Sequence, residues 1–270
     1  MSLSMSTEDW AYYKRGLIAT FPPYREVVVD KNSLFKRFKE AFYIRWDSDF
    51  DKSNNKNYYH VIKDGEFIID SLPVKTRNAV RKCLKNCEIN QVDSGYIIEN
   101  GGYDIYSSEY LRYQRKGHPS PIKSQRRWAE GMREAELNGQ EFWGVVYKNS
   151  LIAYSICLSK EKHVNLVTWK VDYERYNMLY PSYGLVYKMC ECYLNQESVL
   201  YVSDGGRSLT QHSNVQNFLI DKFRFRKAYT KLNVLFRWYL LPIIKMIAPF
   251  ERYIRHNNLR SLVRLYKWSR

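Results

Sequence analysis

The sequence predicts an α+β or mixed α/β fold, in which a central, mostly antiparallel sheet is flanked by helices. Residues 141–171 hold three successive apolar, β-branched runs separated by short polar turns, which is the pattern of antiparallel strands joined by hairpins. Segments with helical spacing of apolar residues come before and after these runs. Helices at both ends of an antiparallel run favour a mixed architecture over an all-helical or all-strand one.

The first 70 residues predict strands and turns around one short helix. Ser33 can cap a helix that continues to about Ala41, because its hydroxyl accepts hydrogen bonds from the free amides of a helix start. The Asp64-Gly65 pair lies between two apolar runs and predicts a hairpin. The other features of this segment are a β-branched run at 27–29, a polar loop at 47–57, and the two hairpin strands at 58–62 and 67–69.

From residue 71 to residue 236, helices and strands surround the central hairpins. Pro73 favours a helix start, because a residue at the first helical position has no intrahelical use for an amide hydrogen. Asn138-Gly139 favours the end of a later helix. The predicted helices cover 73–86, 107–115, 124–137, 185–194 and 214–222. One predicted strand begins at residue 87, and the others cover 142–147, 151–158, 164–171, 199–202 and 229–236.

The chain is strongly basic. Its 270 residues carry 43 Lys and Arg against 28 Asp and Glu, a net charge of +15, and 45% of them are hydrophobic, enough for a sizeable core. A positive field of this size attracts polyanions, namely nucleic acid, anionic lipid or a phosphate-bearing cofactor, and does not choose among them. A solvated basic surface without a dedicated ligand is the alternative.

The cysteines and the chain start indicate a cytoplasmic protein. Five cysteines without framework spacing predict reduced thiols, and no third and fourth ligand near Cys83 and Cys87 completes a metal site, so no metal is expected. Residues 1–10 lack the apolar stretch of a signal peptide. No run reaches the roughly 18 apolar residues that a membrane span needs.

Residues 237–270 combine eight Lys and Arg with a single acid, Glu251, and interleave them with Trp, Tyr and Leu. This pattern is typical of a basic amphipathic helix on a membrane surface, and it predicts peripheral contact with the inner membrane surface. A helix pair packed on the domain or across a homodimer is one alternative. A contact with RNA, such as tRNA, is another.

The order strand, strand, strand, loop, helix, strand, helix, strand over about residues 70–236 resembles the GNAT acyltransferase fold, and within it the Fem-like branch of bacterial envelope enzymes. The resemblance implies that the fourth strand splays from the fifth and that the acyl cofactor enters the splay. It also implies that the helix between these strands points its N-terminus at the cofactor's pyrophosphate. Here that helix starts at Pro181-Ser182-Tyr183-Gly184, where Gly184 allows a close approach of the backbone.

Two further segments are similar to parts of that fold. Residues 218–225 resemble its late helix, but Ile220 stands where many members have a tyrosine acid, and Arg224 stands where they have a glycine. The basic helix at 71–87, with Lys75, Arg77 and Arg81, resembles the opening helix of the Fem-like group. The resemblance to that group implies an aminoacyl-tRNA donor.

Acyl transfer to an amine requires a base, a polarised carbonyl and a proton for the leaving group. Asp204 ends a predicted strand, and it could orient His212 as a base across the following loop. A local Asp-Gly turn and a polar residue at a helix start are the structural alternatives for these two residues. Asp172 and Glu174 follow the third strand, where the family often has its base.

Ligands of α/β sheets bind where strands end and helices begin. Cys190 and Cys192 form an alternative nucleophile pair, against which stands the ordinary role of buried thiols in packing. The candidate cofactor-binding residues are Ser182, Tyr183, Gly184, Arg207, Ser208 and Asn214.

The sequence thus predicts an N-acyltransferase that uses acyl-CoA, with acetyl-CoA as the expected co-substrate, and acts on an amine of a small molecule or an envelope precursor. A Fem-like transferase fed by aminoacyl-tRNA is one alternative. A non-catalytic basic module that binds anionic membrane or nucleic acid is the other. The expected domains are a strand-rich segment at 1–70, related to a degenerate first GNAT-like half, an acyltransferase domain at 71–236 and a basic helical tail at 237–270.

Overall fold

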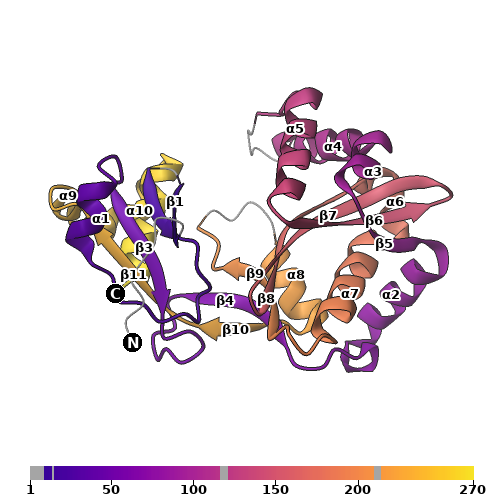
Figure 1. Ribbon diagram of the computed structural model, residues 1–270, viewed down its shortest axis with the longest axis horizontal. Coiled ribbons are helices and arrows are strands. Elements are labelled where there is room, and N and C mark those ends of the chain that lie inside the picture. Colours follow the sequence, from indigo (N-terminus) through magenta and orange to yellow (C-terminus); the bar gives the residue numbers. More distant parts are fainter. Residues whose placement is uncertain (1–8, 14, 116–120, 210–213) are drawn as a thin grey trace. The chain divides into compact units, whose positions relative to one another are not determined.

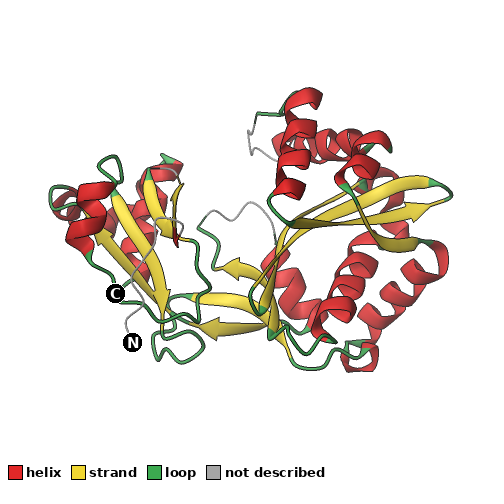
Figure 2. Cartoon of the chain, viewed as in Figure 1, coloured by secondary structure: helices red, strands yellow, loops and turns green. Residues whose placement is uncertain are grey.

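The computed structural model describes residues 9–13, 15–115, 121–209 and 214–270 (Figure 1). The chain divides into two compact units. Unit 1 comprises residues 1–61, 206–211 and 227–270, and unit 2 comprises residues 62–205 and 212–226. Both units combine helices with strands (Figure 2), which confirms the predicted fold class.

Unit 1 is built on a four-stranded sheet in the order β1-β2-β3-β11. The outer pairs β1/β2 and β3/β11 are antiparallel, whereas β2 and β3 are parallel. These strands are β1 (Trp10–Tyr13), β2 (Gly16–Ala19), β3 (Tyr43–Ser48) and β11 (Lys231–Phe236).

Alternate residues of β3 face two separate apolar cores, because successive side chains of a strand point to opposite faces. Ile44 lies in a cluster with Leu17 and Leu34, the last of which is on helix α1 (Lys31–Arg37). Tyr43 lies in a second cluster with Leu265 of helix α10 (Asn257–Trp268). Both faces of this sheet are therefore covered.

The C-terminal segment forms part of unit 1. Helix α9 (Leu240–Ile247), the 3-10 helix η4 (Ala248–Tyr253) and α10 share a buried cluster of Ile244, Ala248 and Val263. A helix pair packed on the domain was one of the alternatives that the sequence allowed for residues 237–270, and the structure has this packing.

Unit 2 contains four successive antiparallel strands, and the hairpins predicted within residues 141–171 are confirmed. Lys148 and Asn149 both have positive φ, 48° and 62°, as the tight turn between the first two of the predicted strands requires. The strands are β5 (Glu88–Val92), β6 (Gln140–Tyr147), β7 (Ser150–Lys160) and β8 (His163–Val171).

Strand β9 (Tyr201–Gly206) runs parallel to β8 but pairs with only its first residues. The ladder joins residues 163–165 to residues 201–203 and ends there. Beyond Asn165 and Ser203 the two strands part (Figure 1). The result is a splayed parallel pair, with the end of β8 on one side and Asp204 on the other.

Helices cover both faces of the unit 2 sheet (Figure 1). Helices α3 (Ser94–Glu99), α4 (Gly102–Arg115) and α5 (Gln125–Leu137) lie on one face, with Trp128, Phe142 and Tyr154 in the buried cluster beneath them. On the other face, α7 (Pro181–Leu194) lies on the strands, and α2 (Val74–Asn86) packs on α7. The remaining helices of unit 2 are α6 (Tyr173–Tyr176), η2 (Ile69–Ser71), η3 (Asn177–Leu179) and α8 (Val215–Phe223).

The hairpin predicted at Asp64-Gly65 is wrong. Strand β4 (Tyr59–Asp64) ends at this pair, and no strand follows before η2. Phe67 is buried, and its ring lies 5.6 Å from that of Tyr187 on α7, so the chain is drawn onto a helix instead of turning back along β4.

The single strand predicted at 229–236 is also wrong. It divides at Thr230 into β10 (Arg226–Tyr229), which adjoins β4, and β11, which pairs with β3. Thr230 is buried, and its amide donates to the carbonyl of Tyr58 at 3.2 Å while its hydroxyl donates to the carbonyl of Ala228 at 3.0 Å. These bonds fix the bend between the two strands.

Four boundaries near predicted elements differ as well. Asp30, and not Ser33, caps α1, because its side chain accepts from the amides of residues 32 and 33. Residues 27–29 form no strand. The predicted loop at 47–57 begins only after Ser48, because β3 continues through Asp47. The helix predicted at 107–115 begins at Gly102.

Candidate functional site

Asp204 lies at the open end of the splayed pair in unit 2. It directly follows Ser203, which is the last residue of β9 that pairs with β8. Gly205 follows with a φ of 80°, and its amide donates to the Ser203 hydroxyl at 2.8 Å. The tight turn predicted at Asp204-Gly205 is therefore wrong, because β9 continues through Gly206. The positive φ of Gly205 is an irregularity within the strand, next to the point where β8 and β9 diverge.

The Asp204 carboxyl has an unusual basicity. Burial raises the pKa of Asp204 to about 7, and a hydrogen bond with the side chain of Gln216 on α8 offsets part of that rise. A carboxyl with this pKa is present in both protonation states near neutral pH, which suits a group that accepts and returns a proton.

Aromatic rings from three elements gather in the same part of unit 2. Phe218 of α8 lies edge-on to Tyr183 of α7, with ring centroids 5.0 Å apart, and to Trp169 of β8, at 6.5 Å. The rings join the far end of β8 to the starts of α7 and α8. Asp204 and its partner Gln216 belong to two of the elements that border this splay, β9 and α8.

The start of α7 is occupied by contacts within unit 2. The Tyr180 carbonyl accepts from the amides of Tyr183 and Gly184, at 2.9 and 3.2 Å, and the Ser182 hydroxyl is 2.7 Å from that of Tyr173. A Cβ atom built on Gly184 would lie 2.4 Å from Cys83 Sγ of α2. Packing of α2 on α7 therefore accounts for the glycine.

The other predicted acids have local partners. Asp172 is buried, and its carboxylate accepts from the Arg175 amide at 3.2 Å and from its guanidinium at 2.5 Å, so it caps α6. Glu174 is exposed and pairs with Arg115. His212 lies outside the described residues. Asn214 precedes α8, and its side chain makes no capping bond to the helix.

Arg207 and Ser208 line a cavity of about 750 Å³ within unit 1. Three arginines contribute to its wall, Arg15, Arg45 and Arg207, together with His256. None of the residues that line this cavity is an Asp or Glu, so it offers cations and hydroxyls to a ligand. The arrangement suits an anion such as a phosphate or carboxylate.

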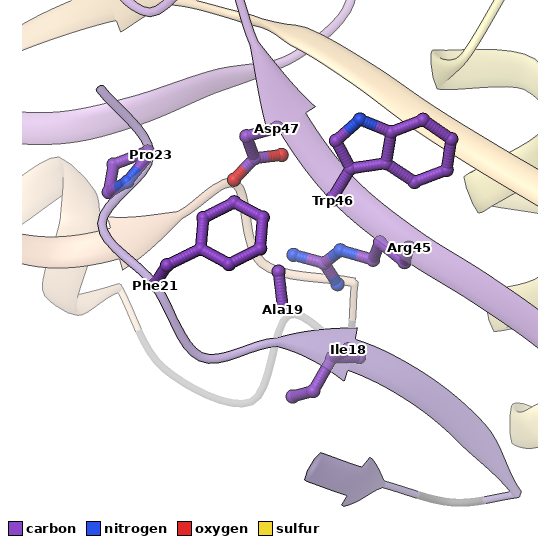
Figure 3. A pocket seen from close by; sticks show the side chains of 7 residues that line it. All are labelled: Ile18, Ala19, Phe21, Pro23, Arg45, Trp46 and Asp47. Carbon is purple, nitrogen blue, oxygen red and sulfur yellow. The ribbon is translucent and has the colours of Figure 1, made fainter. Parts of the chain in front are cut away.

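A buried polar network adjoins that cavity. Arg45 Nη2 donates to the Tyr58 hydroxyl at 2.7 Å, and Asp47 Oδ2 lies 2.9 Å from His60 Nε2. The other Asp47 oxygen is buried without a hydrogen-bond partner among the described residues. Figure 3 shows Asp47 and Arg45 reaching toward the ring of Phe21 around a smaller cavity of about 80 Å³.

Sequence reasoning missed Arg15, Arg45, Asp47, His60 and His256. One signal was available, because Tyr43, Arg45 and Asp47 alternate with apolar Ile44 and Trp46, and a period of two predicts a strand with one polar face. No such local signal joins residues 15, 45, 207 and 256, which meet only in the folded unit.

The remaining sequence candidates carry less chemistry. Cys190 is buried, and burial raises the pKa of its thiol, which disfavours the nucleophilic thiolate. The described ranges contain no group of three His, Cys, Asp or Glu side chains that could hold a metal ion. Among the helices of the described residues, none combines the length and apolar character needed to cross a bilayer.

The sequence matches no protein-family model and no curated protein. Several solved structures are similar with TM-scores below 0.5, among them the following two. A conserved protein of unknown function from Bacteroides thetaiotaomicron has 10% identity and a TM-score of 0.46, covers 76% of this chain, and is itself spanned over 66% of its length. The DUF2156 C-terminal domain of a putative lysylphosphatidylglycerol synthetase from Agrobacterium fabrum has 8% identity and a TM-score of 0.47, with 89% and 83% of the two chains covered.

The structure of FemX gives a stronger likeness. Its TM-score is 0.56 at 10% identity, and the match covers 88% of this chain and 85% of that one. At this identity the likeness concerns the fold, which in both chains is the GNAT-like acyltransferase fold.

Proposed function

We propose that this protein is an acyl or aminoacyl transferase that acts on an amine, with Asp204 as its base. The observation that carries the proposal is the partly buried Asp204 carboxyl at the open end of the β8/β9 splay, with a pKa raised to about 7. An ordinary carboxylate is a weak proton acceptor for an ammonium group, and a raised pKa lessens that mismatch. The fold shared with FemX gives further support.

In the proposed reaction the Asp204 carboxylate takes a proton from the acceptor's ammonium group. The freed nitrogen lone pair attacks the acyl carbonyl carbon and forms the amide bond. The bond from that carbon to the leaving sulfur or oxygen then breaks. The leaving group receives the proton that Asp204 took up, so the carboxylate is restored. The second proton that the nitrogen loses on becoming an amide passes to solvent, so the reaction releases one proton overall.

Two compounds are candidates for the acyl donor of this reaction, aminoacyl-tRNA and acyl-CoA. The bonded amides at the start of α7 and the filled space beside Gly184 leave fewer free groups for a pyrophosphate, which favours aminoacyl-tRNA over acyl-CoA. The net charge of +15 supports either donor, because both carry phosphates. Acyl-CoA, including acetyl-CoA, is the competing proposal.

We further propose that the arginine-lined cavity of unit 1 holds an anionic group of a substrate. Arg207 has its guanidinium 4.5 Å from the centroid of the Trp268 ring and donates to the Asn57 carbonyl at 2.6 Å, so it is held in place. Arg45 is held by Tyr58. Fixed guanidinium groups lose little freedom when they bind an anion.

The test measures amide formation from radiolabelled aminoacyl-tRNA and from labelled acetyl-CoA, with ethanolamine, an ordinary ammonium compound at neutral pH, as a small amine probe. We expect wild-type turnover with one donor, and a loss of at least about 100-fold in Asp204→Asn, the usual worth of a general base. The rate should rise with pH through about 7, because the base acts when it is deprotonated.

The matched control is Asp221→Asn, which makes the same chemical change at an exposed position on α8. It should leave the rate unchanged. The proposal would be overturned if wild type used neither aminoacyl-tRNA nor acetyl-CoA, or if Asp204→Asn kept full activity.

A further inference from the structure

Large apolar side chains are exposed along α9 and η4 in unit 1. Tyr239, Ile243 and Met246 are spaced by four and three residues, which keeps them on one side of α9. Phe250 and Tyr253 follow in η4, where Phe250 interrupts the helical geometry. The exposed fractions of these five side chains range from 42% at Tyr239 to 68% at Met246, and neighbouring Trp238 is 85% exposed. We call these six residues the apolar stripe.

Folding of unit 1 does not require the stripe to be apolar. The opposite side of the same segment supplies the packing, through Ile244 and Ala248 against Val263 of α10. Scattered exposed apolar residues are common on protein surfaces, but a contiguous row of them marks a surface that meets another apolar phase.

The charge beside the stripe is positive. Lys245, Arg252 and Arg255 are exposed in or next to the same segment. The only acid of residues 237–270, Glu251, accepts from Arg264 and Lys267 of α10 at 2.9 and 2.8 Å, so its charge is already paired. An occupant of this segment therefore meets exposed apolar side chains together with exposed cations.

We propose that unit 1 docks on an anionic lipid bilayer through the apolar stripe. Aromatic side chains such as Trp and Tyr favour the boundary between headgroups and acyl chains, and the three cations would face anionic headgroups. A second copy of this chain fits less well, because a symmetric interface through the stripe would bring two sets of the cations Lys245, Arg252 and Arg255 into one interface. Helix α9 has eight residues and so would lie in the plane of the surface.

This inference goes beyond the proposed function and does not depend on Asp204. It concerns where the protein works, whereas the base concerns what it does. Each can therefore fail without the other, because vesicle binding is measured without any donor or acceptor.

The first experiment is co-sedimentation of the full chain with extruded vesicles. Vesicles of phosphatidylcholine with about 30% phosphatidylglycerol should bind the protein at least about tenfold more tightly than pure phosphatidylcholine vesicles, because the cations add to apolar insertion. Absence of binding to the anionic vesicles would overturn the proposal.

The second experiment tests the stripe itself. Met246→Glu with Phe250→Glu should weaken binding to the anionic vesicles at least about tenfold, because two carboxylates oppose insertion into an anionic surface. The matched control is Met178→Glu with Leu137→Glu, at positions of unit 2 that are 68% and 88% exposed. Equal weakening in both pairs would overturn the assignment to the stripe.

The third experiment tests the cations. Replacing Lys245, Arg252 and Arg255 by Glu should weaken binding about 100-fold, from about one kilocalorie per mole for each basic residue near an anionic surface. The control replaces Lys75, Lys82 and Lys85 of α2, all exposed, and changes the net charge equally. Equal losses would assign the binding to overall charge and overturn the proposal.

A last measurement separates the bilayer from a second copy. Sedimentation velocity without lipid should give a monomer over the concentrations used for vesicle binding. A concentration-dependent dimer that Met246→Glu with Phe250→Glu abolishes would assign the stripe to a second copy and overturn the proposal.

Discussion

Three consecutive residues, Asp204-Gly205-Gly206, have three different physical roles. Asp204 carries a partly buried carboxyl, and Gly205 adopts a φ of 80° that a side chain would strain. Gly206 has no such φ, but a Cβ atom there would lie 2.0 Å from the Tyr58 hydroxyl. The last three residues of β9, which the sequence predicted to be a tight turn, therefore join a chemical group, a backbone requirement and a packing requirement.

The partly buried acid should cost the protein stability at neutral and alkaline pH. The pKa of Asp204 is raised to about 7 by burial, so its contribution to stability is full below the unfolded-state pKa near 4 and is lost as pH rises through about 7. Asp204→Asn removes this titration. The variant should gain stability over wild type between about pH 4 and pH 8, by up to about 4 kcal/mol.

Urea denaturation at several pH values, followed by circular dichroism, measures this gain. Asp221→Asn, the exposed control on α8, should follow the wild-type pH dependence. A gain for Asp204→Asn that stays the same at every pH would contradict a raised pKa. The expected pairing of higher stability with lost turnover is typical of groups kept for chemistry.

Among the elements, those specified by local pattern were predictable. The strands of residues 141–171 alternate with short turns, and the Ser124 side chain caps α5 at the predicted position by accepting from the Arg127 amide. The pairing of β3 with β11 joins residues almost 190 positions apart, for which a single sequence has no local signal. The same limit applies to the arginines of the unit 1 cavity. Asp204 could be singled out from the sequence because an acid follows an apolar run there, although the strand in fact continues through Gly206.

The contact between α2 and α7 provides a test at the level of elements. In Gly184→Ala, the new Cβ would lie 2.4 Å from Cys83 Sγ and 2.6 Å from Ile89 Cδ1. We expect a loss of about 1–3 kcal/mol in the free energy of unfolding, because the site is already filled. Combining it with Cys83→Ala should restore part of this loss, since the nearest atom is then gone.

Gly131→Ala on α5 is the control, because the nearest atom to its Cβ, Lys123 Nζ, is 3.8 Å away. That variant should gain up to about 1 kcal/mol from helix propensity. If Gly184→Ala instead kept its stability but lost donor binding, the glycine would serve a ligand, as the resemblance to the GNAT fold implies, and the packing account would be wrong.

At the scale of the whole molecule, unit 1 is held together by contacts between the two ends of the chain. Arg237 donates to the carbonyl of Phe35 in the last turn of α1 at 3.4 Å, and to those of Phe38 at 3.3 Å, Lys39 at 2.6 Å and Ala41 at 2.8 Å, which directly follow the helix. Carbonyls at the end of a helix have no partners within it, and a guanidinium satisfies several at once.

Arg237→Ala should therefore lower the free energy of unfolding by about 2–4 kcal/mol, because charged hydrogen bonds are lost and carbonyls are left unpaired. Arg255→Ala, at an exposed position, should change it by less than about 0.5 kcal/mol. Urea denaturation followed by tryptophan fluorescence gives both values. Equal stability of the two variants would contradict the capping role of Arg237.

The division of unit 1 into three stretches of chain has a consequence for its synthesis. Unit 2 is complete once residue 226 has left the ribosome, whereas unit 1 still lacks β11 and α10 at that point and lacks α10 until residue 268 has emerged. Its first 61 residues then present one face of β3, including Tyr43, without the helix that covers it. In a nascent chain interrupted after residue 236, unit 2 would therefore be folded while unit 1 would not. Chaperones and proteases would act on unit 1 first.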